Sequence, residues 1–260
     1  MVSLPHFGFF DWLLILCVSV FGTFSSKVRD PQIKAVFATV PVPFSLVWLA
    51  VGLPVASSNV AGSFLILAYV HGVRILHDRA HVPIIPSIAF GIALYAGIGA
   101  LLAHRIPDNL SVFLFLSALS LLSGALILVF QNYRSGVFYR TPLPPLPKFV
   151  SIFCVVTGLV WIKGLLVGFA PFFPLMNSVI SYEARHSLPT QCRQIPVFMV
   201  AASPMLVWMR FAECSWNWPR GWVLATGVTL YMLVFLPLNA KVRKLGMKNQ
   251  TPTPNAPSGC

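Results

Sequence analysis

Hydrophobic residues along this chain come in long runs that short polar segments separate. The longest run extends from Phe149 to Tyr182 and contains one charged residue, Lys163. The hydrocarbon layer of a bilayer is about 30 Å thick and about 20 helical residues cross it, so this run is too long for a single crossing. Gly168 and Pro171 weaken a helix near its middle, and backbone freed at that depth must be covered by protein. We therefore predict two segments, 149–168 and 169–183.

The other long apolar runs predict an all-α fold, a polytopic transmembrane helix bundle with about nine spans. No Lys or Arg precedes the first run, so it lacks the basic segment of a signal peptide and is expected to stay attached. The further runs lie at 9–24, 34–54, 58–76, 84–104, 110–130, 195–211 and 220–239.

Composition agrees with a membrane protein whose main partner is the lipid bilayer. Apolar residues make up 57% of the chain and charged residues 9%, roughly a third of the charged share of a soluble domain. The net charge of +12 could suggest nucleic acid. However, the Lys and Arg residues lie between the apolar runs rather than in one patch, so we expect no nucleic-acid partner.

The basic residues are distributed unevenly between the two sides that this layout defines. By the positive-inside rule, the side that contains more Lys and Arg is cytoplasmic, so the N-terminus is predicted outside and the C-terminus inside. Treating 149–183 as one crossing would remove the asymmetry. The sparse side contains Arg105, Arg210 and Arg220. The rich side contains Lys27, Arg29, Lys34, Arg74, Arg79, Arg134, Arg140, Lys148, Arg185, Arg193, Lys241, Arg243, Lys244 and Lys248.

Proline and polar residues divide the chain into two predicted membrane halves. The segment 134–148 contains Pro142, Pro144, Pro145 and Pro147, which favour a semi-rigid extended linker. Residues 1–133 and 149–240 are the two halves. The tail, 241–260, is polar and Pro-rich without apolar periodicity, so we expect it to be disordered.

Two stretches resemble each other in these halves. SSKVRDPQIKAVFATVPVPF follows the first run, and SYEARHSLPTQCRQIPVFM follows the segment 169–183. The pairing sets Pro41 against Pro196 and Arg29 against Arg185, and it predicts a parallel internal repeat. The alternative is a coincidence of basic turns with a membrane proline.

The same pattern, a basic turn followed by an apolar helix with an early proline, resembles the small GlpM-like inner-membrane proteins. The resemblance covers only this turn and helix in each half. It implies a membrane protein, expected in a bacterial inner membrane, and it assigns no site residue.

Pro-interrupted spans at matching positions of two halves indicate a transporter binding site, because broken helices expose backbone groups at the membrane centre. The alternative is that these prolines only kink packed helices. The candidates are Pro41, Pro43 and Ser45 in the first half and Pro196, Ser203 and Pro204 in the second.

The long middle run adds further candidate contacts for a solute, among them Pro171 at its break. Lys163 would suit an anion if it faces the interior, although its place beside Trp161 also fits a lysine that extends to the membrane surface. Asn177 and Ser181 are four residues apart and would share a helix face with Glu183 nearby. Alternatively, Glu183 forms an ion pair with an arginine at the membrane surface.

His77, Asp78 and His81 form a weak candidate metal site, because the two imidazoles are four residues apart and would face one side of a helix. The alternative is a cytoplasmic anchor next to Arg74 and Arg79. No phosphate-binding loop, Gly-x-Ser-x-Gly or HExxH pattern occurs in the sequence. We therefore assign no catalytic residue and no cofactor.

These observations favour an integral membrane transporter or channel-like protein for a small neutral or anionic solute. Two alternatives stay open. One is a non-catalytic membrane subunit, which would assemble with a partner subunit or with further copies of itself. The other is an integral-membrane enzyme acting on lipid, which would need a convergent His and carboxylate pair near Glu183 or Asp78.

Overall fold

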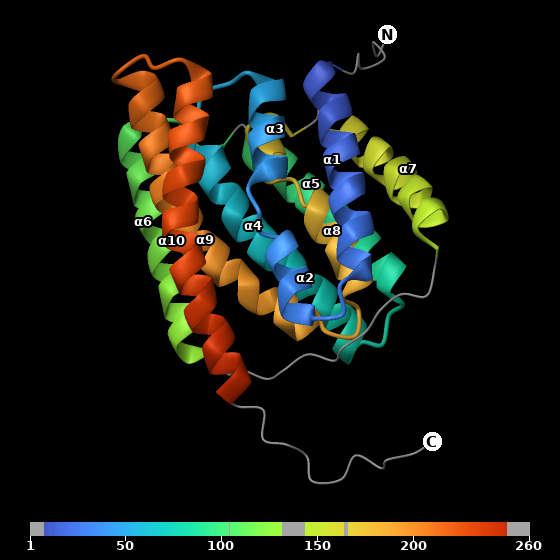
Figure 1. Cartoon of the computed structure of the whole chain (residues 1–260). Coiled ribbons are helices and arrows are strands. Elements are labelled where there is room, and N and C mark those ends of the chain that lie inside the picture. Colours follow the sequence, from blue (N-terminus) through green and yellow to red (C-terminus); the bar gives the residue numbers. More distant parts are fainter. Residues whose placement is uncertain (1–7, 104, 132–143, 164–165, 249–260) are drawn as a thin grey trace, which may run out of the picture.

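The structure is a computed structural model that describes residues 8–103, 105–131, 144–163 and 166–248 (Figure 1). Across these residues the chain is helical and contains no strand. Its helices are α1 (Phe9–Lys27), α2 (Pro31–Phe37), α3 (Val42–Val51), α4 (Ser57–Arg74), α5 (Ile84–Ala103), α6 (Leu110–Phe130), α7 (Pro145–Lys163), α8 (Leu175–Glu183), α9 (Leu188–Cys214) and α10 (Arg220–Lys248). A π-helical turn, η1 (Ile75–Arg79), continues α4, and a 3₁₀ segment, η2 (Val167–Phe172), precedes α8.

Within the described residues, 7 segments are long and apolar enough to cross a membrane, with α2 and α3 together as one of them and α4 with η1 as another. The apolar part of α7, Pro145–Trp161, is shorter. Large hydrophobic side chains such as Phe115, Leu122 and Phe130 are exposed on the outer faces of the bundle. A soluble protein would not present so many to water, so the chain is a helical integral membrane protein.

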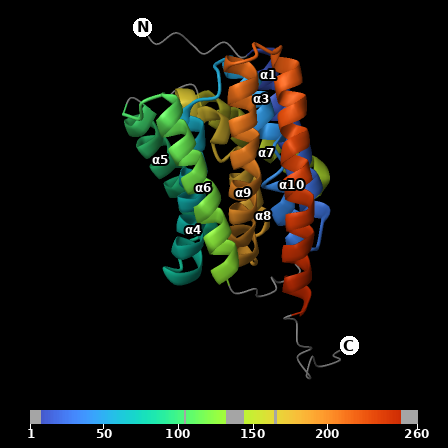
Figure 2. The same ribbon diagram turned by 90° about the vertical axis from the view of Figure 1, so that its left-hand side faces the viewer.

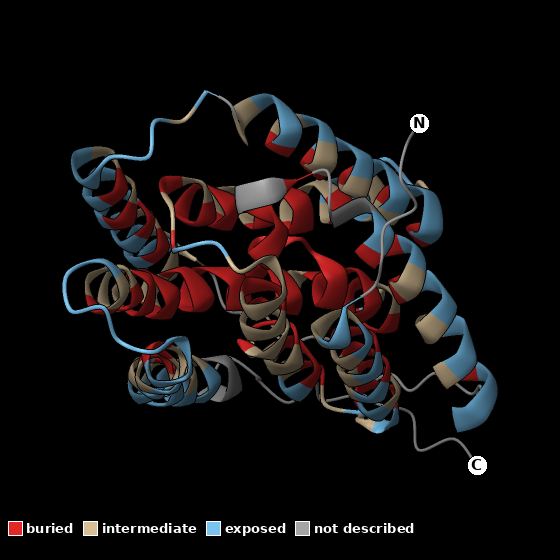
Figure 3. Cartoon of the chain, turned by 90° about the horizontal axis from the view of Figure 1, so that it is seen from above, coloured by how far each residue is buried: buried red, intermediate tan, exposed pale blue. Residues whose placement is uncertain are grey.

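The helices form one bundle in which α9 is central (Figures 1 and 2). Buried residues make up 67% of the apolar window of α9 but 22% of the windows of α6 and α10. In the view along the bundle, the buried residues lie in the middle and the exposed ones on the outer helices (Figure 3). The two predicted halves, 1–133 and 149–240, share this core, because α1 contacts α7 and α6 contacts α9.

The two ends of the bundle are named here by their place in Figure 1. The upper end contains the start of α1 and the turn between α9 and α10. The lower end contains the turn between α8 and α9 and the end of α10. Three tryptophans of the α9–α10 region, Trp208, Trp216 and Trp218, contact one another at the upper end, which is typical of a membrane interface.

The second span is broken between α2 and α3, as Pro41 led us to expect. Pro41 and Pro43 both lack a backbone donor, and Pro41 forces Val40 out of helical geometry. Two carbonyl groups freed at the break accept hydrogen bonds from other helices: Ala38 O from Asn177 Nδ2 at 3.5 Å and Thr39 O from the Tyr231 hydroxyl at 2.6 Å. The break is therefore covered by protein, as membrane depth requires.

The long middle run is also broken, and its second part is η2 followed by α8 rather than one helix. The first helix ends at Lys163, earlier than the expected 168. Pro171 lies inside the short 3₁₀ segment, and Pro174 is the N-cap of α8. The Tyr95 hydroxyl donates to Phe169 O at 3.2 Å, so α5 satisfies a carbonyl that the break exposes. A Cβ on Gly62 of α4 would lie 2.9 Å from Phe172 Cβ, so η2 packs closely against α4.

Several expected boundaries and breaks differ from the structure. Pro196 and Pro204 lie inside a continuous α9, which corrects the expectation of a broken span there. Pro196 O lies against Gly124 of α6, 3.0 Å from where a Cβ would stand, and such close neighbours stabilise a proline-containing membrane helix. The first turn of α7 lies within the predicted linker, because prolines are tolerated at a helix start. Helix α10 continues to Lys248, so the tail is helical over 241–248; residues 132–143 and 249–260 lie outside the described part.

Candidate functional site

A small pocket lies where the two broken segments meet. It has about 30 Å³ of space for the centres of water molecules, enough for roughly two waters. We call it the central pocket. Pro41, Pro43 and Phe44 line it from the α2–α3 break, and Pro171 lines it from η2. The remaining wall includes Met176 and Asn177 of α8 and Ile195 and Phe198 of α9.

The central pocket has mostly apolar walls and one amide side chain. None of the described residues that line it is charged, and Asn177 is 5% exposed. Pro41 is the N-cap of α3, and Met176 and Asn177 belong to the first turn of α8. The first backbone N–H groups of a helix have no partner within it and carry partial positive charge. The start of α8 therefore favours a ligand with electronegative atoms, whereas the start of α3 offers fewer donors because Pro41 and Pro43 lack N–H groups.

A second pocket lies above Pro171, which lines both. This upper pocket has about 120 Å³ of space for water centres and is bounded by Trp48, Leu53, Asn59 and Ala103 among others. The indole N–H of Trp48 is buried without a hydrogen-bond partner. Buried donors are nearly always satisfied, so this N–H group is available to water or a polar solute in the upper pocket.

Below the central pocket, three charged side chains are buried together. Lys148 Nζ lies 3.1 Å from Glu183 Oε1 and 3.3 Å from Oε2. Lys34 Nζ donates to the backbone carbonyl of Glu183 at 3.2 Å. Lys34, Lys148 and Glu183 are 2%, 4% and 1% exposed. Burying charges is costly unless they are paired, so Glu183 holds the last turn of α2 and the start of α7 against the end of α8.

Amide and hydroxyl groups of α8 and α9 form a network beside the central pocket. Ser181 Oγ donates to Gln191 Oε1 at 3.0 Å, and Gln191 Nε2 donates to Asn177 O at 3.1 Å and to Asn177 Oδ1 at 3.4 Å. Asn177 therefore belongs both to the pocket wall and to this network. We call the set Lys34, Lys148, Asn177, Ser181, Glu183 and Gln191 the lower cluster.

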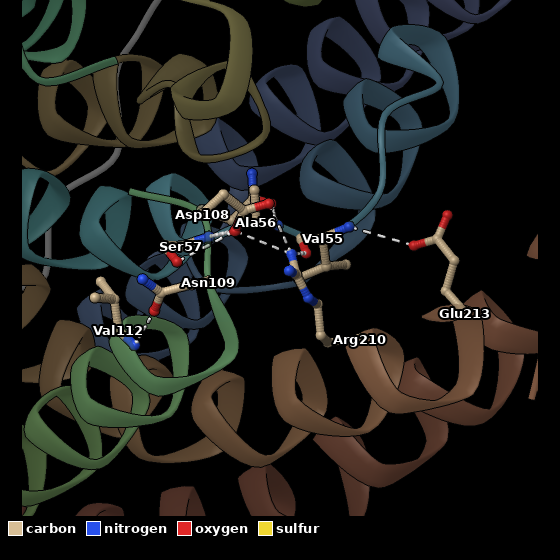
Figure 4. A network of polar contacts seen from close by, with 9 residues as sticks. Val55, Ala56, Ser57, Asp108, Asn109, Val112, Arg210 and Glu213 are labelled. Carbon is tan, nitrogen blue, oxygen red and sulfur yellow. Dashed lines mark hydrogen bonds and ion pairs between the residues drawn. The ribbon is translucent and has the colours of Figure 1, made fainter. Parts of the chain in front are cut away.

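A second polar network, shown in Figure 4, joins the loop before α4 to α9. Arg210 Nη1 lies 3.0 Å from both carboxylate oxygens of Asp108 and also donates to Val55 O. Ser57 donates to Asp108 Oδ1 through its backbone N–H at 2.9 Å and its hydroxyl at 3.2 Å. Glu213 Oε2 accepts from Val55 N at 3.3 Å. This upper network therefore ties the loop before α4, which borders the upper pocket, to α9 and to the α5–α6 loop.

Stability of the upper network is predicted to depend on acid pH. Partial burial acts to raise the pKa of Asp108, but hydrogen bonds from Ser57 and Arg210 and the charge of Arg210 lower it below its ordinary value overall. A carboxyl whose pKa is lowered in the folded state contributes stability that is complete above its unfolded pKa and is lost as pH falls through the folded one. We expect the melting temperature to decrease as the pH is lowered below about 4. The decrease should be smaller in Asp108→Asn. An equal acid response of the two proteins would contradict this.

Four of the predicted site residues, Pro41, Pro43, Pro171 and Asn177, line the central pocket together. Ser181 and Glu183 lie in the lower cluster. The other candidates lie elsewhere: Ser45 and Ser203 donate to carbonyls of their own helices, Pro41 O at 2.8 Å and Met199 O at 2.8 Å. Pro196 faces α6. The side chain of Lys163 lies outside the described residues.

The candidate metal residues are not arranged as a site. His81 follows the end of the helix with a φ of 54°, so it does not share a helical face with His77. His77 Nδ1 contacts Val82 O at 2.9 Å, and Asp78 Oδ2 lies 3.6 Å from Arg74 Nε. Among the described residues no group of three potential ligands is close enough to hold a metal ion.

Sequence reasoning missed Lys34, Lys148 and Gln191. The sequence pattern indicates only a topology signal for the two lysines, and it places Gln191 before the expected span 195–211. Helix α9 begins at Leu188 with Pro189 in its first turn. Proline at that position indicates a helix start and is the signal that would have placed Gln191 on a helix.

None of the protein-family models, curated proteins or solved structures compared with the chain matches it significantly. Nothing in these comparisons bears on the resemblance to the GlpM-like proteins. The site is therefore interpreted from its own geometry.

Proposed function

We propose that the chain is a membrane transporter or channel-like protein that moves a small neutral or anionic solute through the central pocket. The observation that carries the proposal is the meeting of two broken segments at this pocket, with Pro41 on one side and Pro171 and Asn177 on the other. Broken helices at a shared pocket are the usual construction of a transporter binding site. The apolar walls and the start of α8 favour a small solute with at least one hydrogen-bond acceptor.

Polar contacts close this pathway on both sides. The upper network joins the loop before α4 to α9, and the lower cluster joins α2, α7 and α8 through Glu183. Alternating access requires that one closure opens while the other holds. Ion pairs suit this role, because water replaces their contacts when they separate. We assign Asp108 with Arg210 to the upper closure and Lys148 with Glu183 to the lower one.

The proposed topology has about nine crossings. It adds α7, and η2 together with α8, to the segments that are long enough to span. The beginning of α1 and the end of α10 lie at opposite ends of the bundle (Figure 1), which agrees with an odd number of crossings. The lower end contains Lys34, Lys148 and Arg193, so the positive-inside rule favours a cytoplasmic lower end and C-terminus. We propose a bacterial inner membrane as the location.

An internal duplication is part of the same proposal. The turn after α1 and the turn after α8 both lie at the lower end, and each leads into a helix with proline in its first turn, Pro31 and Pro189. The proposed copies have diverged, since α2 ends before Pro41 while α9 continues through Pro196.

Flux measurements test the proposed function. The purified full chain is reconstituted into liposomes, and stopped-flow light scattering follows the entry of glycerol, urea, formate and nitrate. At least one of these solutes is expected to enter at least about tenfold faster than in protein-free liposomes, a rate ratio that corresponds to about 1.4 kcal/mol of barrier. If all four solutes entered no faster than in protein-free liposomes, and a stable partner co-purified with the chain, these results would favour a membrane subunit instead.

The remaining alternative, an enzyme acting on lipid, has less support from the geometry. The carboxylate of Glu183 is held by Lys148, and that of Asp78 by Arg74. A general base must reach the proton that it removes, and an ion pair with a lysine or arginine favours a structural role for these two groups.

A further inference from the structure

A separate pocket at the lower end has the donor groups of an anion site. It lies between the first turns of α2 and α9 and the later part of α10, and it has about 50 Å³ of space for water centres. We call it the rim pocket. Among the described residues, none lines both the rim pocket and the central pocket. The polar lining of the rim pocket is Gln32, Thr190, Arg193, Gln194, Asn239 and Arg243.

Positive charge and hydrogen-bond donors predominate in the rim pocket. Arg193 is 8% exposed, which is unusual for an arginine. Arg243 lies on the rim, where Asp30 Oδ2 is 3.5 Å from its Nη2 and neutralises part of its charge. Gln194 Nε2 donates to Asn239 Oδ1 at 3.0 Å, so the NH₂ group of Asn239 is not used in that contact. Among the described residues that line the rim pocket, two have guanidinium groups and none has a carboxylate.

One hydroxyl group in the wall lacks a partner. Thr190 is 7% exposed, and its Oγ1 is buried without a hydrogen bond. Buried polar atoms are nearly always satisfied, and an exception indicates a missing water, ion or ligand. Thr190 also belongs to the first turn of α9, where the helix dipole favours negative charge. A hydrogen-bond acceptor in the rim pocket would give this hydroxyl a partner.

We propose that the rim pocket binds a phosphoryl group, either that of an anionic lipid headgroup or that of free phosphate. Arginine forks match phosphate oxygens in geometry and charge. The space is sufficient for roughly four waters, which is comparable to the oxygens around one phosphorus. The pocket lies beside the end of a membrane helix in the basic part of the molecule, where lipid phosphates are found. This site is independent of the proposed transport pathway.

The test compares probes that differ only in the phosphoryl group. Native mass spectrometry of the full chain in detergent measures binding of dioleoyl phosphatidylglycerol and of dioleoylglycerol, which has the same acyl chains without phosphate. Thermal unfolding with millimolar inorganic phosphate measures the free ion. The variants are Thr190→Val, Arg193→Gln and Arg243→Gln. Lys244→Gln is the matched control, because it removes an exposed positive charge next to Arg243 without touching the pocket.

The proposal predicts that phosphatidylglycerol binds and dioleoylglycerol does not, or that inorganic phosphate raises the melting temperature. The first result identifies a lipid source and the second a free ion. Thr190→Val, Arg193→Gln and Arg243→Gln should each weaken binding by about tenfold, as expected for the loss of a hydrogen bond to a charged group, while Lys244→Gln should not. Thr190→Val should fold at least as well as the parent chain without ligand, since it removes an unsatisfied hydroxyl. Equal binding of both lipids with no phosphate effect, or unchanged binding by Thr190→Val, would overturn the proposal.

Discussion

Replacing Glu183 by Gln is expected to destabilise the folded protein by about 3–5 kcal/mol, the usual cost of breaking a buried ion pair. The change leaves Lys148 at 4% exposure without its carboxylate partner at 3.1 Å. Lys34, 2% exposed, would also lose a nearby negative charge. The purified chain is unfolded in mixed detergent micelles by titration with SDS. The difference in the free energy of unfolding between the variant and the parent chain measures the effect.

The matched control makes the same chemical change at an exposed pair. Asp78 and Arg74 are 3.6 Å apart, and their side chains are 36% and 39% exposed. Asp78→Asn is expected to cost less than about 1 kcal/mol. The double variant Lys148→Met with Glu183→Gln should lose less free energy of unfolding than the sum of the losses in the two single variants, because it removes both charges of the pair. Equal, small effects of Glu183→Gln and Asp78→Asn would show that the buried pair does not hold these helices together.

Replacing Asn177 by Leu is expected to reduce solute flux by at least about tenfold. The change removes the only amide side chain among the described residues that line the central pocket, and it fills a space that holds roughly two waters. It also removes the donor to Ala38 O at the α2–α3 break. Stopped-flow flux in liposomes, normalised to the amount of folded protein, measures the effect.

Ser203→Ala is the control for this prediction. Ser203 is also buried, at 3% exposure, but its hydroxyl donates to Met199 O within α9 and does not line the central pocket. Its flux should match that of the parent chain. If Asn177→Leu and Ser203→Ala transported equally well, solute would not pass along Asn177.

Much of the helix layout follows from the sequence alone. The expected spans 84–104 and 110–130 agree with α5 and α6 almost to the residue, because uninterrupted apolar runs begin there after Pro83 and Asn109. The second span and its break were predictable for a similar local reason. Pro41 and Pro43 remove two donors within one turn.

The structure differs from the sequence predictions where tertiary contacts decide. A single proline does not show whether a membrane helix will break: α9 continues through Pro196, which lies against α6, whereas the span that contains Pro41 is broken. The polar stretch before residue 195 predicts a loop, yet Gln191 lies in α9 and is fully buried. Lys34 and Lys148 are far apart in sequence, so no local pattern indicates that both approach Glu183.

Cysteine accessibility of the central pocket tests the account most directly, because it does not require that the solute be known. In a chain whose native cysteines are replaced by alanine, Asn177→Cys is reconstituted in sealed liposomes and treated with a charged, membrane-impermeant methanethiosulfonate. Val18→Cys, buried at 1% exposure on α1 and away from the pocket, is the control. A water-connected solute pathway predicts that the thiol introduced by Asn177→Cys reacts from at least one side of the membrane, while the thiol introduced by Val18→Cys does not. Equal protection of both positions from both sides would contradict the pathway.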